Sequence, residues 1–162
     1  MKNIINKFNC YIQMIKIRRF KIADAKATSK LIKNALLKVN SKDYDIKLIR
    51  SMCKHFSPKT IIENAKVRIV YVGVLEDKII GTASIVKNII LTVFVDPKYH
   101  GKGIGAKLMQ TVEKSAKKKG YKLVKVPSSI TAYNFYKKLG YKKVKEVYHK
   151  DAGKNIIMKK RI

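Results

Sequence analysis

The sequence has little of the features that define several large classes of proteins. Only two of its 162 residues are cysteines, Cys10 and Cys53, and their spacing fits neither a metal motif nor a disulfide framework. We interpret both as free thiols in a reducing compartment, which predicts a cytoplasmic protein. No run of 18 apolar residues is present, so no transmembrane helix is expected. Three lysines interrupt residues 1–17, which do not resemble a signal peptide.

Acidic residues are also scarce, with 10 aspartates and glutamates against 38 lysines and arginines and a formal net charge of +28. Clustered cations release counterions from phosphate backbones, so this charge makes nucleic-acid binding one possible function. The lysines are spread from Lys2 to Lys160, however, and no stacking aromatics are interleaved with an arginine stripe. We therefore interpret them mainly as solvated surface positions, which still steer anionic ligands toward the protein.

The hydrophobic pattern predicts one α/β domain over residues 14–162, with residues 1–13 as a short extension or as residues preceding a true start at Met14. Strands are expected at residues 12–20, 67–75, 79–86, 89–95, 123–126, 141–148 and 155–159. Helices are expected at residues 25–38, from 41 or 43 to 53, 59–65, 103–119, and from 128 or 129 to 139. This order predicts a mixed sheet with helices on both faces.

Three local expectations accompany these elements. Asp24 is predicted to cap the first helix, whose inward face would carry Ala27, Leu31, Ile32, Ala35 and Leu36. The apolar run Ile89–Val95 is typical of a strand buried on both faces. The long helix should face the core with the side chains of Leu108, Met109, Val112 and Ala116.

The most informative stretch is VFVDPKYHGKGIGA, residues 93–106, in which an apolar strand ends, a glycine-rich turn follows and a long helix begins. Glycines at 101, 103 and 105 let a backbone approach a ligand, and the amides and dipole of a helix start favour a phosphate. Lys102 and Lys107 would add charge there. The loop follows a late strand and lacks Gly-Lys-Ser/Thr, so it matches neither a dinucleotide fingerprint nor a Walker loop.

At this loop the sequence resembles the GNAT family, the general-control-related N-acetyltransferases. The family signature Gln/Arg-x-x-Gly-x-Gly/Ala falls on residues 100–105, with His100 in place of Gln or Arg. A second stretch, SSITAYNFYKKLGYKKV, is similar to the family's later helix and strand through Ala132, Tyr136, Lys138, Gly140 and Tyr141. Ser129 stands where the family commonly has Asn.

The resemblance implies a mixed, mostly antiparallel sheet that splays between its fourth and fifth strands, and an enzyme that transfers acetyl from acetyl-coenzyme A to a primary amine of a small molecule or protein. Tyr136 matches the family's general acid; it could instead be a core aromatic beside Phe135. The resemblance implies coenzyme contacts at Val93, Phe94, Val95, His100, Gly101, Lys102, Gly103, Ile104, Gly105, Ala106, Ser129, Ala132 and Tyr136.

The general base and the acceptor stay open at this point. The strand Ile89–Val95 has no carboxylate, which leaves Glu63, Asp45, His55 or a relayed water as bases, and His149 as a residue that could line the acceptor pocket. Residues 39–66 would form a variable lid over the acceptor. Scarce acids disfavour a polyamine or aminoglycoside and favour a small neutral or anionic amine, or a protein amino group.

No metal site is indicated, and the family resemblance allows a homodimer. Two other functions remain: a coenzyme A-binding module without catalysis, and a basic nucleic-acid-binding protein. A coenzyme-dependent rate would exclude the first, and a steep salt dependence of DNA or RNA affinity would support the second.

Overall fold

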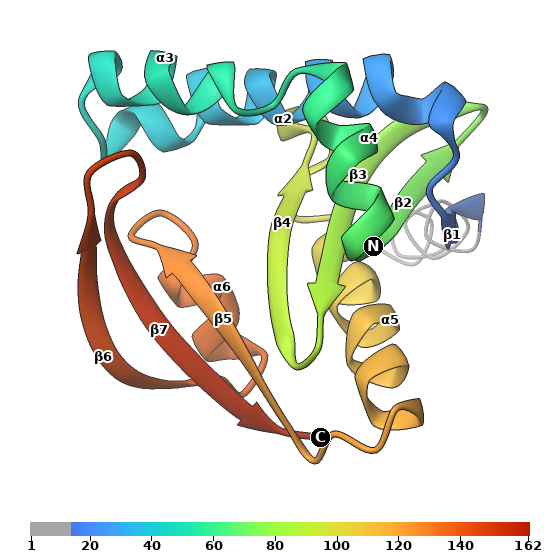
Figure 1. Cartoon of the computed structure of the whole chain (residues 1–162), viewed down its shortest axis with the longest axis vertical. Coiled ribbons are helices and arrows are strands. Elements are labelled where there is room, and N and C mark those ends of the chain that lie inside the picture. Colours follow the sequence, from blue (N-terminus) through green and yellow to red (C-terminus); the bar gives the residue numbers. More distant parts are fainter. Residues whose placement is uncertain (1–13) are drawn as a thin grey trace, which may run out of the picture.

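The computed structural model describes residues 14–162, which form one seven-stranded sheet with helices on both faces (Figure 1). The strands are β1 (Lys16–Arg19), β2 (Ile69–Leu75), β3 (Lys78–Val86), β4 (Ile89–Val95), β5 (Leu123–Ser129), β6 (Lys142–His149) and β7 (Gly153–Arg161). The helices are α2 (Ala25–Lys38), α3 (Ile46–Lys54), α4 (Pro58–Val67), α5 (Ile104–Lys118) and α6 (Tyr133–Lys138), with the short 3-10 helices η1 (Ile22–Asp24), η2 (Asn40–Lys42) and η3 (Pro97–Tyr99).

The sheet order is β1-β2-β3-β4-β5-β7-β6, and every neighbouring pair is antiparallel except β4 and β5, which are parallel. One face is covered by α2, α3 and α4, which bury a small cluster that includes Leu36 and Ile49. The other face carries α5 and α6 and the main core. The four residues expected inward on α5 are all buried there. The predicted fold class is therefore confirmed.

The sheet is held together at its centre by very little pairing. Ile89 and Lys125 are the only residues of β4 and β5 in register, and the Lys125 amide donates to the Asn88 carbonyl at 2.9 Å. Beyond this point the two strands diverge, as Figure 1 shows. Alternate amides of a strand point the same way, so the nitrogen of Pro127 also faces β4. Proline has no N–H to continue the ladder, which gives the divergence a local cause.

The expectation that β4 is buried on both faces is wrong. Ile90 alone is fully buried in this strand; Ile89 is exposed and the remaining residues are half-buried. The cause is the divergence from β5, which leaves one side of β4 uncovered along most of its length. An apolar run therefore indicated a central strand, but not one enclosed by neighbours.

The helix boundaries were predicted with unequal success. The range of α2 agrees with the prediction, although Ala27 is exposed rather than inward. Helix α3 begins at Ile46, where the Asp45 carboxylate accepts from the Lys47 amide at 2.8 Å, so neither Ser41 nor Asp43 is its cap. Residues 12 and 13 of the first predicted strand lie outside the described residues.

Asp24 does not cap α2 with its side chain, contrary to the prediction. Its carboxylate accepts two hydrogen bonds from the Arg18 guanidinium, at 2.7 and 2.8 Å, and one from the Lys21 amide at 2.8 Å. The carboxylate is buried, and the Arg18 hydrogen bonds hold its pKa below the usual aspartate value. A charge-assisted bidentate pair outcompetes a single helix cap, and here it fastens β1 to the start of α2.

We expect Asp24→Asn to lower the free energy of unfolding by about 1–3 kcal/mol, because the variant loses a charge-assisted pair in a buried position. The lowered pKa means that the pair stabilises the protein above the ordinary carboxyl pKa and that this contribution is lost as pH falls through the folded-state value. Chemical denaturation at neutral pH measures the change. The control is Glu63→Gln, which breaks the exposed pair with Lys66 and should cost less than about 0.5 kcal/mol. Equal losses in the two variants would contradict this assignment.

Candidate functional site

The loop that follows β4 is ordered by short polar contacts. The Asp96 carboxylate accepts from the Lys98 amide at 3.0 Å and begins η3, and the Asp96 amide donates to the Ile80 carbonyl at 2.9 Å. His100 Nε2 lies 3.0 Å from the Val95 carbonyl oxygen. The histidine side chain therefore folds back onto the end of β4 and fixes the loop where the sequence suggested a contact to a coenzyme.

Two glycines give the loop its path into α5. Gly101 and Gly103 both have φ of +74°, a left-handed conformation that other residues adopt at a cost. Gly103 is the N-cap of α5 and is exposed. The first amides of a helix lack partners within the helix, so those of residues 103–106 lie at a terminus that favours an anion. Gly105 has a different role, because a Cβ there would lie 3.0 Å from the Phe135 ring of α6.

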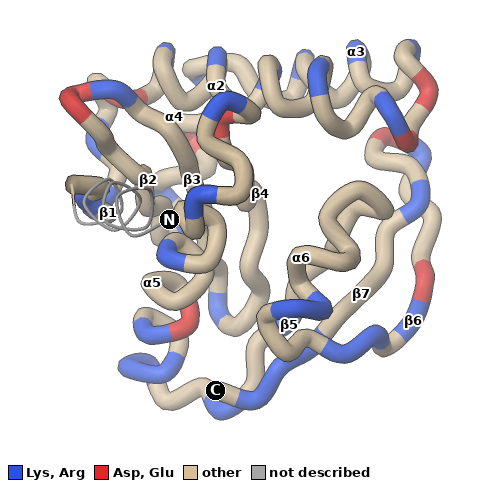
Figure 2. The backbone as a smooth tube through the Cα atoms, turned by 180° about the vertical axis from the view of Figure 1, so that it is seen from behind, with Lys and Arg blue, Asp and Glu red and all other residues tan. Residues whose placement is uncertain are grey.

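The lysines near this helix start are placed unequally. The Lys102 ammonium lies 5.1 Å from the Tyr99 ring centroid, within the loop. The Lys107 ammonium instead donates to the Ile15 carbonyl at 2.6 Å and so joins α5 to the chain before β1. Basic residues are distributed over most elements of the fold, as Figure 2 shows, rather than gathered on one.

A β-bulge in β4 is a feature that the sequence did not reveal. Leu91 pairs with Ser84 and Phe94 with Thr82, so two residues of β4 stand opposite one of β3. Thr92 within the bulge has φ of +48°, which costs a non-glycine residue about 1 kcal/mol or more. Its hydroxyl lies 2.6 Å from that of Ser84. The bulge disrupts pairing with β3 and frees backbone polar groups beside the divergence.

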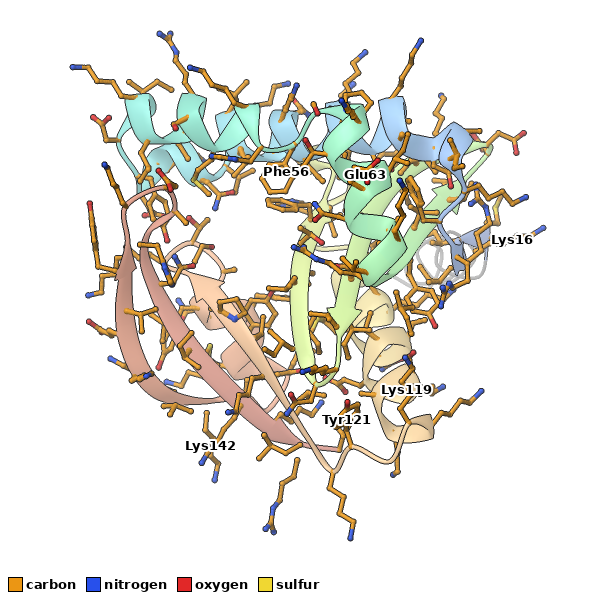
Figure 3. The ribbon with its side chains drawn as sticks, in the orientation of Figure 1. Lys16, Phe56, Glu63, Lys119, Tyr121 and Lys142 are labelled. Atoms are coloured by element: carbon orange, nitrogen blue, oxygen red, sulfur yellow. The ribbon has the colours of Figure 1, made fainter. Side chains whose placement is uncertain are left out.

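The side chains of β4 anchor the strand on both faces. Val93 and Val95 pack against the main core, whereas Phe94 packs with the helical layer and makes an edge contact with Phe56, the ring centroids lying 5.9 Å apart. Phe56 lies between the helical layer and β4 in Figure 3. Ile104, another predicted contact residue, is buried in the main core, so its side chain is structural and only its backbone belongs to the loop.

Tyr136 is the buried member of the aromatic pair on α6. Its side chain is 4% exposed, Phe135 is only partly buried, and their ring centroids lie 5.1 Å apart. Burial raises the pKa of Tyr136 above that of an ordinary tyrosine, so the phenol stays protonated at neutral pH. No residue in the described range 14–162 is hydrogen-bonded to its hydroxyl. The ring is therefore a core residue, and its hydroxyl is left available as a donor.

Helix α6 is shorter than predicted, because the residues before Tyr133 form a turn. The Ser129 hydroxyl accepts from the Ala132 amide at 3.1 Å, as expected of a capping serine, but α6 itself begins at Tyr133. Ser128 is fully buried and donates to a neighbouring carbonyl at 2.8 Å. Ser129 is thus bound within its own turn, on β5, across the divergence from β4.

The two parts of the sheet, β1–β4 and β5–β7, are connected again through side chains at the open end of the gap between β4 and β5. The Tyr44 hydroxyl accepts from the Ile130 amide at 2.8 Å and donates to the Lys154 carbonyl at 2.7 Å. Beside it, the Thr131 hydroxyl donates to the Asp43 carboxylate at 2.7 Å. The segment before α3, part of the predicted lid, therefore contacts the loop after β5 and the start of β7.

The candidate bases occupy separate positions that do not converge. Glu63 lies on α4 (Figure 3), is exposed and pairs with Lys66 at 2.9 Å. Asp45 is engaged as the cap of α3. His55 and His149 are exposed at the ends of α3 and β6. Within residues 14–162, no group of three or more His, Cys, Asp or Glu side chains could hold a metal ion.

Comparison with known proteins places this arrangement in a family. The sequence model of the acetyltransferase (GNAT) domain matches residues 29–162. The chain therefore belongs to the GNAT family of acetyltransferases, as its two motifs indicated. No curated protein sequence is detectably similar to it. Among the described residues, no helix has the length and apolar character needed to cross a bilayer.

Solved structures share the fold at low sequence identity. A GCN5-related N-acetyltransferase from Rhodopseudomonas palustris has a TM-score of 0.85 and 21% identity, covering 91% of this chain and 95% of its own. The PaiA N-acetyltransferase of Thermoplasma acidophilum, in complex with coenzyme A, has a TM-score of 0.76 and 21% identity, covering 91% and 99%. An aminoglycoside 6'-N-acetyltransferase complexed with coenzyme A has a TM-score of 0.67 and 16% identity, covering 90% and 96%.

Proposed function

We propose that this protein binds acetyl-coenzyme A between β4 and β5 and transfers the acetyl group directly to a primary amine of a small molecule or protein. The observation that carries the proposal is the single registered pair between these parallel strands, with a glycine-rich helix start at the end of β4. Two of the structurally similar N-acetyltransferases are complexes with coenzyme A. Acetyl-coenzyme A would be the acyl-donor substrate, and residues 14–162 would form the single catalytic domain.

The helix start would bind the pyrophosphate. The amides of residues 103–106 and the dipole of α5 supply positive potential, and Gly103 has no Cβ to hinder the ligand. The His100 side chain is hydrogen-bonded to the Val95 carbonyl and so stabilises the loop. Phosphate binding would therefore rely on backbone groups. The high positive charge raises the encounter rate with an anionic coenzyme.

The bulge in β4 would polarise the thioester. Backbone groups around Val93, freed from the β3 ladder, lie along the open edge where an extended pantetheine can pair with β4. In the reaction the amine nitrogen forms a bond to the carbonyl carbon and the carbon–sulfur bond breaks. The amine loses one proton and the departing thiolate gains one.

Tyr136 would donate a hydrogen bond and then a proton to that sulfur. Its hydroxyl is protonated at neutral pH and has no acceptor in the described part of the chain. The base that accepts the amine proton would be a water relayed to hydroxyl or backbone groups, because Glu63 and Asp45 are engaged elsewhere and His55 is exposed at the end of α3.

Calorimetric titration tests the first step of the proposal. Acetyl-coenzyme A and coenzyme A should each bind at one saturable site at moderate salt, and NAD should not bind. A screen of primary amines by thiol release then tests transfer. Binding without turnover on any amine would favour a coenzyme A-binding module, and no binding would overturn the proposal.

Two nearly isosteric substitutions at Gly103 separate charge from conformation. Both Asn and Asp tolerate a left-handed backbone, but only Asp adds a negative charge beside the pyrophosphate. We expect Gly103→Asp to weaken coenzyme A binding roughly tenfold or more relative to Gly103→Asn. Titration calorimetry of the two variants measures the difference, and equal affinities would mean that the loop does not bind the pyrophosphate.

Tyr136→Phe should lower kcat roughly a hundredfold while leaving coenzyme A affinity unchanged, since it removes only the proton donor. The raised pKa predicts no loss of activity from tyrosine ionisation until pH is well above about 10. Steady-state kinetics across pH measures both effects. The control is Tyr141→Phe, which loses the hydrogen bond to Glu113 and should reduce stability without slowing turnover. A wild-type rate in Tyr136→Phe would remove Tyr136 from the mechanism.

A further inference from the structure

A small cavity lies between the helical layer and the sheet, next to the bulge of β4. Its volume of about 20 Å³ is enough for one small polar group. Phe56, labelled in Figure 3, lies on its wall between α3, α4 and β4. The polar residues that line it are Thr28, Asn64, Arg68, Thr82, Ser84 and Thr92.

One hydroxyl in this cavity is buried without a partner. Thr28 is 1% exposed, and its Oγ1 is the only buried side-chain polar atom of residues 14–162 that makes no hydrogen bond. The hydroxyls of the sheet are satisfied: Thr82 donates to the Tyr71 carbonyl at 3.1 Å, and Ser84 to the Leu91 carbonyl at 3.1 Å. A buried group of this kind costs free energy unless something occupies the cavity and bonds to it.

Arg68 is the one charged residue among the described residues that line the cavity. It is half-buried at the end of α4, and burial lowers the pKa of its guanidinium. No carboxylate lines the cavity, and no residue of the described range pairs with the Arg68 side chain. The Asn64 amide lines the same wall without a hydrogen bond in that range. Donor-bearing residues of α2 and α4 thus line a cavity that contains no carboxylate of residues 14–162.

The cavity also lies beside the reacting region assigned above. Thr92, the residue with positive φ in the bulge, is part of its lining, so the space reaches β4 from the side of α2 and α4. A substrate group in the cavity would be attached to atoms close to the bulge. The cation of Arg68 would repel a polycationic acceptor there and would bind an anion through its planar pair of donors.

We propose that this cavity is a subsite for the carboxylate of the acceptor, so that the amine acetylated by this protein belongs to an amino acid or a similar amino carboxylate. Arg68 and Asn64 would donate to the carboxylate oxygens, and the Thr28 hydroxyl would gain its missing partner. This inference rests on the proposed function, since it names the substrate of the same site.

The test compares acceptors that differ only in charge: glycine, β-alanine and γ-aminobutyrate against their carboxamides, with acetyl-coenzyme A and thiol release as the readout. Rates are compared at equal concentrations of neutral amine. At least one acid should exceed its amide in kcat/KM. Arg68→Gln should lower kcat/KM for that acid roughly ten- to a hundredfold, and leave the amide unaffected. Arg68→Lys, which keeps the charge, should retain part of the preference.

Arg50→Gln is the matched control, because Arg50 is exposed on α3 and its loss changes the net charge equally. Thr28→Val, which keeps the side-chain shape, should lower kcat/KM for the acid by a smaller factor and raise the stability of the free protein. An acid-to-amide ratio near one in the wild type, or the same ratio in Arg68→Gln and Arg50→Gln, would overturn the subsite.

A direct titration separates failure of this inference from failure of the proposed function. If no amine is acetylated, N-acetyl-β-alanine and its amide are titrated onto the protein by NMR. Binding of the acid alone, lost in Arg68→Gln, would support the carboxylate subsite even though transfer had failed. Equal binding of both compounds, or binding of neither, would overturn the subsite.

Discussion

The parting of β4 from β5 is the constraint on which the rest of the structure depends. Parallel neighbours normally share a ladder, but here one registered pair joins them and Pro127 withholds the next donor. The strand edges beyond this point need partners of another kind, because unpaired backbone groups away from water are costly. A linear ligand with amide groups of its own can supply them, and pantetheine is such a ligand. The divergence of the strands therefore supports the proposed binding of an extended substrate along β4.

The same divergence explains why the two halves are tied so firmly elsewhere. On one face α5 packs against β2, β3 and β4, and its Gly105 meets Phe135 of α6, the helix that follows β5. At the open end Tyr44 joins the helical layer to Ile130, just after β5, and to Lys154 of β7. Burial raises the pKa of Tyr44, which keeps its hydroxyl neutral and able to act as both donor and acceptor. The strands can separate without the domain losing its shape because these contacts join the two halves on both faces of the sheet.

Much of the fold followed from local patterns, and the failures share a cause. Helix α2 and the loop through Gly103 were predicted because hydrophobic periodicity and glycine positions are encoded within a few residues. The cap role of Asp24 failed because Arg18, on a different element, offers a stronger partner. The enclosed strand at residues 89–95 failed because its neighbour diverges. The bulge at Thr92 and the cavity at Arg68 had no sequence signal, since both depend on register and packing between distant segments.

The scarcity of acidic residues explains why the Arg68 guanidinium has no carboxylate partner in the described part of the chain. Asp24, Glu113 and Glu146 each pair with basic side chains, so they are not available to Arg68. An excess cation on the surface is solvated at little cost, whereas a half-buried one beside an orphaned hydroxyl lowers the stability of the free protein. An anion that binds there recovers the cost, so ligand binding and stability are linked through the same two residues. A site built in this way gives up some stability in the free state and gains discrimination for a negatively charged acceptor.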